Sequence, residues 1–239
     1  MIDHGEKSTE VPPGADARAE VETGVILDGR LGLYHRKGRW LAVSDLHFGY
    51  EASRRRAGGL WPLWGMETIE ERLRSLVLAY QPETLILVGD VIDSSAAPDE
   101  AIAWLSRVRD LCGALVLIEG NHDRGPIRNR FDFLPWYRTD GFFFEHGHDD
   151  WFSREVSPGE SLMGIRGHLH PSVRFNDGAG TRLNLPAFVL ADDPASGIRQ
   201  AVLPAFSPWA GGSPVQRATA GARVRQWACT RQRVFEIPG

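Results

Sequence analysis

The sequence predicts an α/β fold in which two β-sheets pack face to face and helices cover their outer faces, an αββα sandwich. Between residues 41 and 118, short apolar runs alternate with amphipathic helical segments, which is the order typical of parallel crossover units. Beyond residue 131 the helical periodicity fades, and several apolar segments of strand length follow. The 239 residues are enough for one sizeable core and do not require a second.

The chain divides into an N-terminal tail and one domain. Residues 1–24 hold six acidic and two basic residues, and we expect a flexible acidic tail because its few apolar residues cannot offset the entropy of ordering it. No apolar core follows a basic start there, which argues against a signal peptide. We expect residues 25–239 to form a single domain. It opens with a predicted hairpin at 25–34, where Asp28-Gly29 separates two apolar runs.

The first half of that domain carries the crossover units. The apolar run that ends at Ser44 predicts a strand buried on both faces. Residues 51–66 lack periodicity and are expected to form a loop. The next elements are expected to be a helix at 67–80, a strand at 84–88, a helix that opens at Pro98 and a strand at 114–118.

The second half is predicted to consist mostly of strands, at residues 142–145, 162–165, 181–190 and 198–203. Residues 204–221 are rich in Pro, Gly and Ser and are expected to form a surface loop. Residues 222–239 form an Arg-rich C-terminal segment, which we expect to be a solvated edge that closes with a short strand at 233–237.

The composition argues against a membrane span and against a disulfide framework. Cys112 and Cys229 are the only cysteines, which favours a reducing cytoplasm. No apolar stretch approaches the roughly 20 residues that a membrane span needs. The formal net charge of −4 provides no overall basic field, so any nucleic acid would be held by local strand contacts rather than by wrapping of a duplex.

Five apolar runs end in clusters of Asp, Asn or His. The clusters are Asp45-x-His47, Gly89-Asp90, Gly120-Asn121-His122-Asp123, His146-Gly147-His148 and Gly167-His168-x-His170. Residues two apart in an extended segment point to the same side, and the carboxyl ends of strands in an open α/β sheet share a rim, so the clusters can meet. Imidazole, carboxylate and amide donors without thiolate suit Mn, Fe or Zn better than Ca or Mg. The sequence therefore predicts a metal site at the carboxyl ends of the strands.

Each cluster alone is weak evidence for such a site. An isolated Asp-x-His pair is more often a pair of ordinary hydrogen-bonded polar groups, and an Asp after Gly usually marks a turn. All five clusters in this order, each closing an apolar run, favour the metal site over that structural interpretation.

In this order, the clusters from Asp45 to His170 resemble those of the binuclear metallophosphoesterase (calcineurin-like) superfamily. The resemblance implies the αββα sandwich and two divalent transition-metal ions, manganese in the first place and iron or zinc as alternatives. It implies one metal held by Asp45, His47 and His170, a second held by Asn121, His146 and His168, and Asp90 bridging the two. His122 would be a catalytic histidine that faces the leaving group, and Asp123 would orient it.

Two neighbours of these clusters have less certain roles by sequence. We expect His148 to support the ligands rather than to bind metal directly. Arg124 follows the His122-Asp123 pair, and the sequence leaves open whether it contacts a substrate phosphate or is a surface arginine at the start of a helix.

The segment 51–66 holds Arg54-Arg55-Arg56 together with Trp61 and Trp64. Basic groups can track a phosphate backbone while aromatic rings stack on unpaired bases, at about 1–3 kcal/mol for each base. The alternative is a solvated basic loop whose tryptophans pack on the core. The sequence leaves both interpretations open.

Within the superfamily, the chain most resembles the bacterial ligase-associated DNA damage response endonuclease group. This narrower resemblance lies in the compact single domain, the run at 120–124, the Arg-rich segment after His47 and the Pro204-Ala205-Phe206…Gly211-Gly212…Pro214 tail. It implies a manganese-dependent endonuclease that acts on single-stranded DNA, with repair helicase, nuclease and ligase components as functional partners.

Two alternatives remain open at this stage. The first is a small-molecule phosphodiesterase or phosphatase that uses the same metals on cyclic nucleotides or other phosphate esters. The second is a non-catalytic binding scaffold, of the kind seen in the retromer subunit that resembles these enzymes. The intact set of ligands argues against the scaffold.

Overall fold

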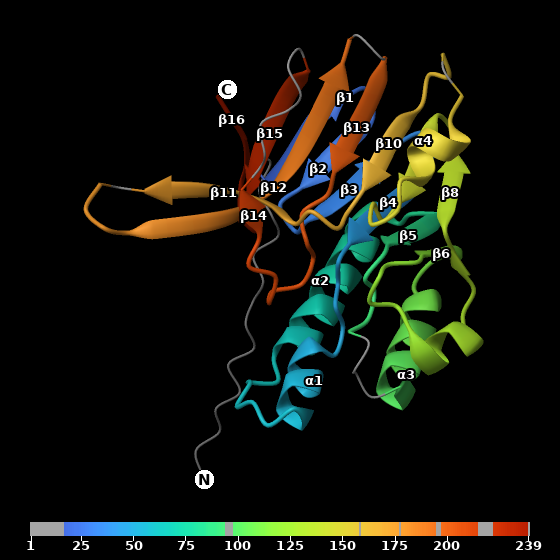
Figure 1. The fold of residues 1–239 in the computed structure, drawn as a ribbon, viewed down its shortest axis with the longest axis vertical. Coiled ribbons are helices and arrows are strands. Elements are labelled where there is room, and N and C mark those ends of the chain that lie inside the picture. The colour runs from blue at the N-terminus through green and yellow to red at the C-terminus, as the bar shows by residue number, and fades with distance from the viewer. Residues whose placement is uncertain are drawn as a thin grey trace.

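The computed structural model describes residues 17–93, 98–157, 159–176, 178–194, 197–214 and 222–238, and within them it confirms an α/β sandwich of two sheets (Figure 1). The first sheet has the strand order β1-β2-β3-β4-β5-β6-β7. Its strands are β1 (Arg18–Glu22), β2 (Val25–Asp28), β3 (Gly32–His35), β4 (Trp40–Ser44), β5 (Thr84–Val88), β6 (Ala114–Ile118) and β7 (Phe133–Leu134).

The second sheet is built from the rest of the chain, in the order β14-β11-β12-β13-β10-β9-β8, with β15 paired to both β12 and β16. Its strands are β8 (Trp136–Thr139), β9 (Phe142–Glu145), β10 (Met163–Arg166), β11 (Pro171–Asn176), β12 (Arg182–Asp193), β13 (Ile198–Val202), β14 (Ser213–Pro214), β15 (Arg223–Cys229) and β16 (Val234–Ile237). Part of β11 and β12 extends sideways from the body of the molecule as a two-stranded arm (Figure 1).

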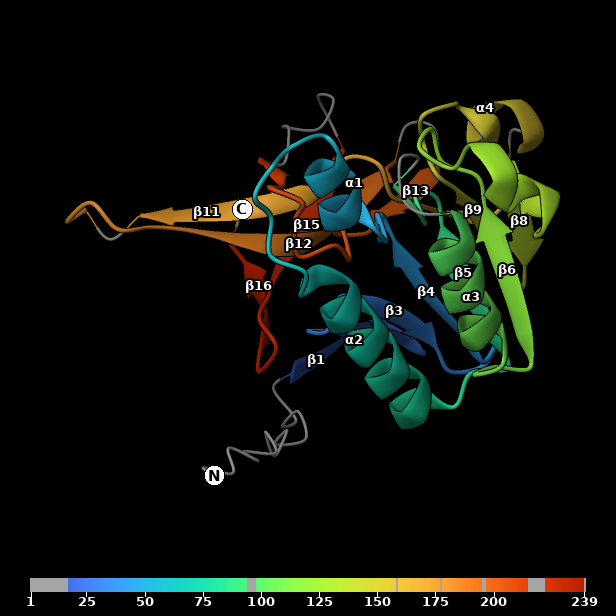
Figure 2. The same ribbon diagram turned by 90° about the horizontal axis from the view of Figure 1, so that it is seen from below.

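Helices cover the outer faces of both sheets. They are α1 (Tyr50–Arg56), α2 (Gly65–Tyr80), α3 (Pro98–Arg109), the 3-10 helix η2 (Gly125–Asn129) and α4 (Trp151–Glu155). Figure 2 shows α2 and α3 side by side over the first sheet. The buried stripe of α2 includes Leu76, whose methyl groups lie 3.1 and 3.2 Å from the position that a Cβ would take at Gly32 on β3. On α3, the ring of Trp104 stacks on Phe48 with 4.0 Å between centroids.

Aromatic side chains join the two sheets. The buried ring of Trp40 on β4 meets Phe142 and Phe144 on β9 edge-on, with centroids 4.9 and 5.0 Å away. Because neighbouring residues of a strand face opposite ways, Phe143 points to the other side, where its ring lies 5.4 Å from Phe152 of α4. The strand β9 therefore lies between the first sheet and α4, which is the layer order of the predicted sandwich.

The strands that precede the polar clusters end level with one another. The strands β4, β5 and β6 are parallel, and Ser44 is paired with Val88, which is paired with Ile118. In the second sheet, Glu145 at the end of β9 is paired in parallel with Arg166 at the end of β10. Each polar cluster begins one or two residues after one of these five ends. The topology therefore delivers all five clusters to one edge of the sandwich.

The prediction of a flexible tail over residues 1–24 is wrong for its last part. Residues 18–22 form β1, which pairs antiparallel with β2. The sequence of β1 alternates charged residues with Ala19 and Val21, which pack against the core, so it suits an edge strand with one solvated face. The remainder of the predicted tail, residues 1–16, lies outside the described residues.

The loop predicted at 51–66 is also incorrect in part, because residues 50–56 form α1. The helix begins after Gly49 and carries Glu51 in its first turn and three arginines in its last turn. Acidic groups near the start of a helix and basic groups near its end are stabilised by the helix dipole. A helix of seven residues is too short to show periodicity, so the apolar pattern did not reveal it.

The surface loop predicted at 204–221 begins inside the protein. Residues 204–207 are buried, and Phe206 is fully so. The backbone N–H groups of Phe206 and Ser207 donate to the carbonyl oxygens of Ser44 and Asp45 at 2.8 and 3.1 Å. These bonds satisfy the buried backbone polar groups, which explains how an irregular segment can be buried. Residues 215–221 of that prediction lie outside the described residues.

The C-terminal segment contributes two strands to the second sheet. The predicted short strand is present as β16, but β15 is paired on both sides and is therefore not the edge that we expected. Cys112 and Cys229 are both free. None of the helices in the described part of the chain combines the length and the apolar character that crossing a bilayer would require.

Candidate metal centre

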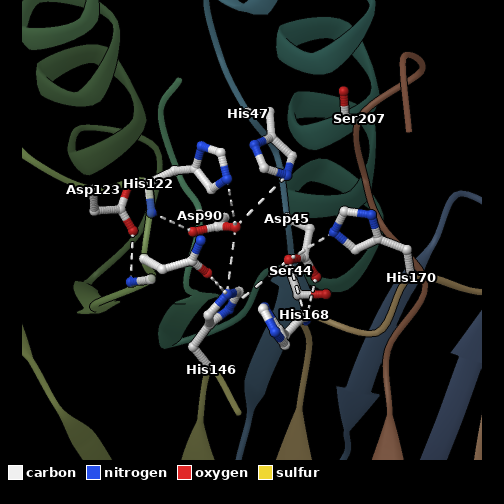
Figure 3. Close-up of polar contacts among 12 residues, drawn as sticks. Ser44, Asp45, His47, Asp90, His122, Asp123, His146, His168, His170 and Ser207 are labelled. Carbon is white, nitrogen blue, oxygen red and sulfur yellow. Dashed lines mark hydrogen bonds and ion pairs between the residues drawn. The ribbon is translucent and has the colours of Figure 1, made fainter. Parts of the chain in front are cut away.

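The predicted ligands converge at the edge where the strands end (Figure 3). The candidate ligand atoms form three groups, and within each group these atoms lie within 4.8 Å of one another. The groups are Asp45 with His47 and His170, His47 with Asp90 and His122, and Asp90 with His146 and His168. Because His47 and Asp90 each belong to two groups, the three groups are parts of one continuous site.

Asp45 links the two sheets at this site. It follows β4 and is fully buried, and both of its carboxylate oxygens accept from the backbone N–H of His168, at 3.1 and 3.0 Å. Its Oδ1 atom also lies 3.1 Å from Nε2 of His170. His168 and His170 both follow β10 of the second sheet. One carboxylate therefore fixes the position of two predicted ligands from the opposite sheet.

Asp90 occupies the centre of the cluster. Its Oδ2 atom lies 3.4 Å from Nε2 of His146, 3.8 Å from Nε2 of His47 and 4.0 Å from Nε2 of His122 (Figure 3). Its Oδ1 atom accepts from the backbone N–H of His122 at 2.8 Å. Burial alone would raise the pKa of Asp90, but the hydrogen bond and charge of His146, helped by His122 and His47, hold that pKa well below its usual range. Asp90 is therefore an anion that faces several histidines at once.

The third group lies on the side of β9. His146 is almost fully buried, and its Nε2 atom lies 3.3 Å from Oδ1 of Asn121, the amide predicted as a ligand. The ring of His168 lies 5.0 Å from that of His146. Asn121, His146 and His168 come from the ends of β6, β9 and β10, so this group is assembled from both sheets.

The protonation tendencies of the histidines fit cation binding. Burial lowers the pKa of His47 and of His168, which favours the neutral imidazole that a metal requires. Burial also opposes protonation of His146, but the neighbouring Asp90 and Asp45 outweigh it and raise the pKa of His146. The two buried carboxylates thus attract positive charge into the site. A metal cation would supply that charge while it leaves all of the imidazoles neutral.

The backbone is strained at the same residues. Among the described non-glycine residues, nine have a positive φ, and five of these nine are predicted ligands. The five are Asp45, His47, Asp90, His168 and His170, with φ between 45° and 66°. Such conformations cost of the order of 1–3 kcal/mol each and concentrate at functional sites, where the surrounding structure holds them in place. Their clustering supports a functional site rather than a set of ordinary polar turns.

Two glycines allow the clusters to approach. A Cβ on Gly167 would lie 2.5 Å from Oδ2 of Asp45, and a Cβ on Gly120 would lie 2.2 Å from Oδ1 of Asp90. Real Cβ atoms do not approach other atoms so closely, so any larger residue would displace a central carboxylate. These contacts explain why the clusters contain Gly at these positions.

The residues present therefore fit a pair of divalent metal ions. The donor set consists of imidazole nitrogens and carboxylate and amide oxygens, which suits transition metals better than calcium or magnesium. All seven predicted ligands lie in the one site, with Asp90 in the position expected of a bridging group.

His122 lies at the more open side of the site. Its side chain is 43% exposed, compared with 3% for Asp90, and its Nε2 atom faces the Asp90 carboxylate. Because His122 also belongs to a group of ligand atoms with His47 and Asp90, its position is compatible with metal binding as well as with the predicted catalytic role. That role remains a prediction.

Asp123 accepts hydrogen bonds from the backbone of neighbouring segments, not from the ring of His122. It is fully buried, and its carboxylate accepts from the N–H groups of Ile92 and Gly120 at 3.0 and 2.8 Å. Burial raises the pKa of Asp123 to about 7. Asp123 therefore ties the segment that carries His122 to the segment after β5, a long-range contact that the sequence could not reveal.

His148 and Arg124 lie outside the groups of ligand atoms. The Nε2 atom of His148 lies 3.5 Å from Asp149, and its ring lies 5.2 Å from that of His146, which agrees with a supporting position. Arg124 is exposed at the start of η2, so both of its sequence interpretations stay open. Sequence reasoning missed Arg166, whose Nη2 donates to the carbonyl of Gly147 at 2.9 Å and supports the segment between His146 and His148.

The tryptophans predicted as base-stacking residues pack against other aromatic side chains. The ring of Trp61 lies 5.4 Å from Tyr50 and 5.0 Å from Trp209, and that of Trp64 lies 4.5 Å from Trp209. The indole N–H of Trp209 donates to buried Glu51 at 2.9 Å, which anchors this aromatic cluster on α1. Trp64 is still 44% exposed. The three arginines Arg54, Arg55 and Arg56 are exposed at the end of α1.

Comparison with known proteins places this geometry in context. The family model of calcineurin-like phosphoesterases matches residues 38–190, which include every predicted ligand. The crystal structure of the Pseudomonas putida nuclease MPE is similar to the chain, with a TM-score of 0.63 and 26% sequence identity. The similarity covers 92% of this chain and 98% of that one.

Two further structures superpose less well. A conserved protein from Streptococcus pneumoniae, described as a predicted phosphoesterase, has a TM-score of 0.36 and 16% identity over 83% of this chain and 95% of its own. A dimetal phosphatase from Danio rerio has a TM-score of 0.40 and 9% identity over 83% of this chain and 98% of its own. No curated protein sequence matches the chain significantly.

Proposed function

Because the chain belongs to the calcineurin-like phosphoesterase family, we propose that it is a two-metal phosphodiesterase and that its substrate is single-stranded DNA, which it cleaves as an endonuclease. Membership of the family supports a hydrolase of phosphoester bonds that uses divalent metals.

One observation carries the two-metal proposal. Asp90 shares an oxygen between His146 on one side and His47 on the other, at 3.4 and 3.8 Å. We assign Asp45, His47 and His170 to one metal and Asn121, His146 and His168 to the second, with Asp90 common to both. Manganese is the first candidate, and iron and zinc suit the same donors. A pair of divalent ions supplies Lewis-acid stabilisation of the charge on phosphoryl oxygens and lowers the pKa of water.

The protein itself would supply the acid. The imidazole of His122 lies beside Asp90, and its greater exposure leaves room for a leaving group next to it. The Oδ2 atom of Asp90, which is held as an anion, lies 4.0 Å from Nε2 of His122. A proton on His122 can then pass to the departing oxygen, and such general acid catalysis typically contributes about 10²–10⁴-fold. Asp123 acts as a positioning residue through the backbone that carries His122.

Two observations support DNA as the substrate. The first is the similarity to a protein described as a nuclease, which extends over almost the whole of both chains. The second is the position of Arg54, Arg55 and Arg56 on α1, a helix that starts three residues after His47. Exposed guanidinium groups at that distance along the chain can hold the phosphates of a bound strand. Trp61, Trp64 and Arg124 belong to the same proposed contact surface.

The proposed cellular role and partners rest only on the resemblance of the sequence. A role in DNA repair in the cytoplasm, beside helicase, nuclease and ligase components, follows from the endonuclease group that the sequence resembles. The net charge of −4 limits the strand contacts to local ones, and it equally suits a phosphodiesterase for cyclic nucleotides or other small esters. That small-molecule activity is the second candidate.

One experiment separates the candidates. The purified protein would be loaded with manganese and given single-stranded circular DNA and, separately, an aryl phosphodiester. We expect nicking of the circle and hydrolysis of the ester, both abolished by a chelator and by the neutral variant Asp90→Asn. Hydrolysis of the ester without nicking would favour the small-molecule candidate, and failure on both substrates would favour the scaffold.

A further inference from the structure

A cavity of about 220 Å³ lies beside the metal centre. His170 borders both, since it is a proposed ligand and also part of the cavity wall. The polar lining comes from Arg72, His170, Ser172, Asn184 and Ser207, and no Asp or Glu lines the cavity among the described residues. Figure 3 shows Ser207 on the same side of the centre as His47 and His170. The cavity therefore offers hydrogen-bond donors and a positive charge next to the proposed metal centre.

Arg72 supplies the charge. One nitrogen of its guanidinium donates to the carbonyl of Phe206 at 2.8 Å, while the Nε atom is buried without a hydrogen-bond partner. Within the described ranges, no carboxylate lies within ion-pair distance of Arg72. Burial, followed by the positive charge of neighbouring Arg231, lowers the pKa of Arg72 to about 10, so it keeps its charge at neutral pH. A guanidinium with little exposure is usually paired with an anion in proteins, and none of the described carboxylates pairs with half-buried Arg72.

Ser172 supplies a second unused donor. The residue lies on β11, only 2% of it is exposed, and its hydroxyl has no partner in the described structure. Gly212 packs against it so closely that a Cβ there would lie 2.6 Å from Cβ of Ser172. A hydroxyl that is buried and unpaired is costly, so its position in the same cavity wall as Arg72 calls for a ligand that accepts hydrogen bonds.

We propose that this cavity is a second phosphate subsite, which holds the phosphate next to the scissile one in a polynucleotide and so selects chains over simple phosphodiesters. Phosphate oxygens accept hydrogen bonds from a guanidinium and from a hydroxyl. Their negative charge would also pair with the positive charge of Arg72. Pockets that enclose a whole small ligand usually measure about 300–1,000 Å³, so a cavity of about 220 Å³ suits one phosphate group with part of its sugar.

This inference rests on the proposed phosphodiesterase function, and matched substrates separate the two. The probes are three aryl esters of thymidine 5′-phosphate that share the same aryl leaving group. The first carries the scissile phosphate only, the second is extended by one nucleotide through a second phosphate, and the third carries a neutral methylphosphonate in place of that second phosphate. The comparison between the second and third esters isolates the charge of the neighbouring phosphate.

Three variants complete the design. Arg72→Gln and Ser172→Ala remove the proposed donors, and Arg74→Gln is the matched control because Arg74 lies on the same helix but pairs with Glu70 on the surface. The hydroxyl of Ser172 has no partner to lose, so Ser172→Ala should fold normally. This second variant matters because Arg72 also holds the segment at Phe206, and its loss can disturb that segment.

We expect wild type and Arg74→Gln to prefer the charged over the neutral extended ester at least tenfold in kcat/KM. In Arg72→Gln and Ser172→Ala that preference should fall below threefold. Equal preference in all four proteins, or none in wild type, overturns the subsite. Cleavage of the esters without cleavage of DNA refutes the endonuclease, while the preference between the two extended esters still supports or overturns the subsite.

Binding of inorganic phosphate to the metal-free protein gives a readout without turnover. In calorimetric titrations, wild type and Arg74→Gln should bind phosphate at least tenfold more tightly than Arg72→Gln. Equal binding by the three proteins overturns the subsite even if none of the esters is hydrolysed.

Discussion

The Nε2 atom of His146 lies 3.4 Å from Oδ2 of Asp90, although His146 follows a strand of the second sheet and Asp90 follows a strand of the first. Both residues are almost fully buried. The same oxygen of Asp90 faces His47 at 3.8 Å, so a single carboxylate connects the two proposed groups of ligands. The site can therefore form only when the two sheets have packed together.

The central position of Asp90 predicts that its loss affects both metals. Asp90→Asn keeps the size of the side chain but removes the shared charge, so metal content should fall at both positions and activity should be lost. Loss of an outer-shell partner typically costs about 10–100-fold in metal affinity or activity, and loss of this residue should exceed that range. Metal content would be measured by mass spectrometry on the purified protein, with exposed Asp110→Asn as the control. Retention of both metals would contradict the bridging role.

The position of His122 predicts a defect in turnover without loss of metal. His122→Ala leaves the backbone N–H that bonds to Asp90 in place, so both metals should stay bound. Hydrolysis should slow by about 10²–10⁴-fold for esters with poor leaving groups, because these need a proton on the departing oxygen. Esters with acidic phenol leaving groups should slow much less. Loss of a metal from this variant would show instead that His122 is a ligand.

The arginines of α1 are predicted to act on DNA alone. Replacement of Arg54, Arg55 and Arg56 by Gln should raise KM for single-stranded DNA several-fold and spare an aryl phosphodiester. The dependence of log affinity on log salt should also become shallower, by about 0.7 for each phosphate contact that is lost. A similar loss on both substrates would remove these arginines from the DNA surface.

A charge-matched variant controls for the net charge of the protein. Arg36, Arg39 and Arg109 are exposed, with side chains that are 62%, 53% and 62% accessible. Arg39 precedes the start of β4, and Arg109 ends α3 before β6, so both lie away from the edge that carries the metal centre. Replacement of these three arginines by Gln should leave cleavage of DNA unchanged.

Much of the site could be predicted from the sequence because its signals are local. Each ligand cluster directly follows an apolar run, and parallel pairing brings the ends of such runs level, as the Ser44–Val88–Ile118 register confirms. The helices expected at 67–80 and from Pro98 are present as α2 and α3 for the same reason, since their apolar stripes repeat within the segment. Local pattern and tertiary position agree at these elements.

The elements that the sequence did not predict depend on partners far along the chain. Residues 204–207 have the composition of a surface loop, yet Ser207 reaches the carbonyl of Asp45. Asp123 appeared to be a neighbour of His122 alone, yet its carboxylate holds the N–H of Ile92. Nothing in the sequence indicated that Arg72 and Ser172 would line one cavity. Contacts of this kind arise only when the two sheets meet.

A buried ion pair in the first sheet predicts a pH-dependent part of the stability. Asp28 is fully buried and accepts from Nη2 of Arg30 and from the hydroxyl of Tyr80, both at 2.8 Å. Burial alone would raise the pKa of Asp28, but the hydrogen bonds and charge of Arg30, together with Tyr80, lower it. Asp28→Asn removes the carboxylate charge that pairs with Arg30, and breaking such a buried pair costs about 3–5 kcal/mol.

The sign of the pH effect follows from the lowered pKa. The folded protein holds the proton of Asp28 less tightly than the unfolded chain does, whose value lies near 3.9. The stabilisation by the Asp28 carboxylate is therefore complete above about pH 5 and is lost as the pH falls through the folded pKa. The difference in unfolding free energy between wild type and Asp28→Asn should thus be largest at pH 7 and shrink below pH 4. Urea titrations of the metal-free proteins would measure it, with Asp110→Asn expected to stay within about 0.5 kcal/mol of wild type. A difference that stays constant from pH 7 to pH 3 would show that Asp28 stabilises the fold by shape and hydrogen bonding rather than by charge.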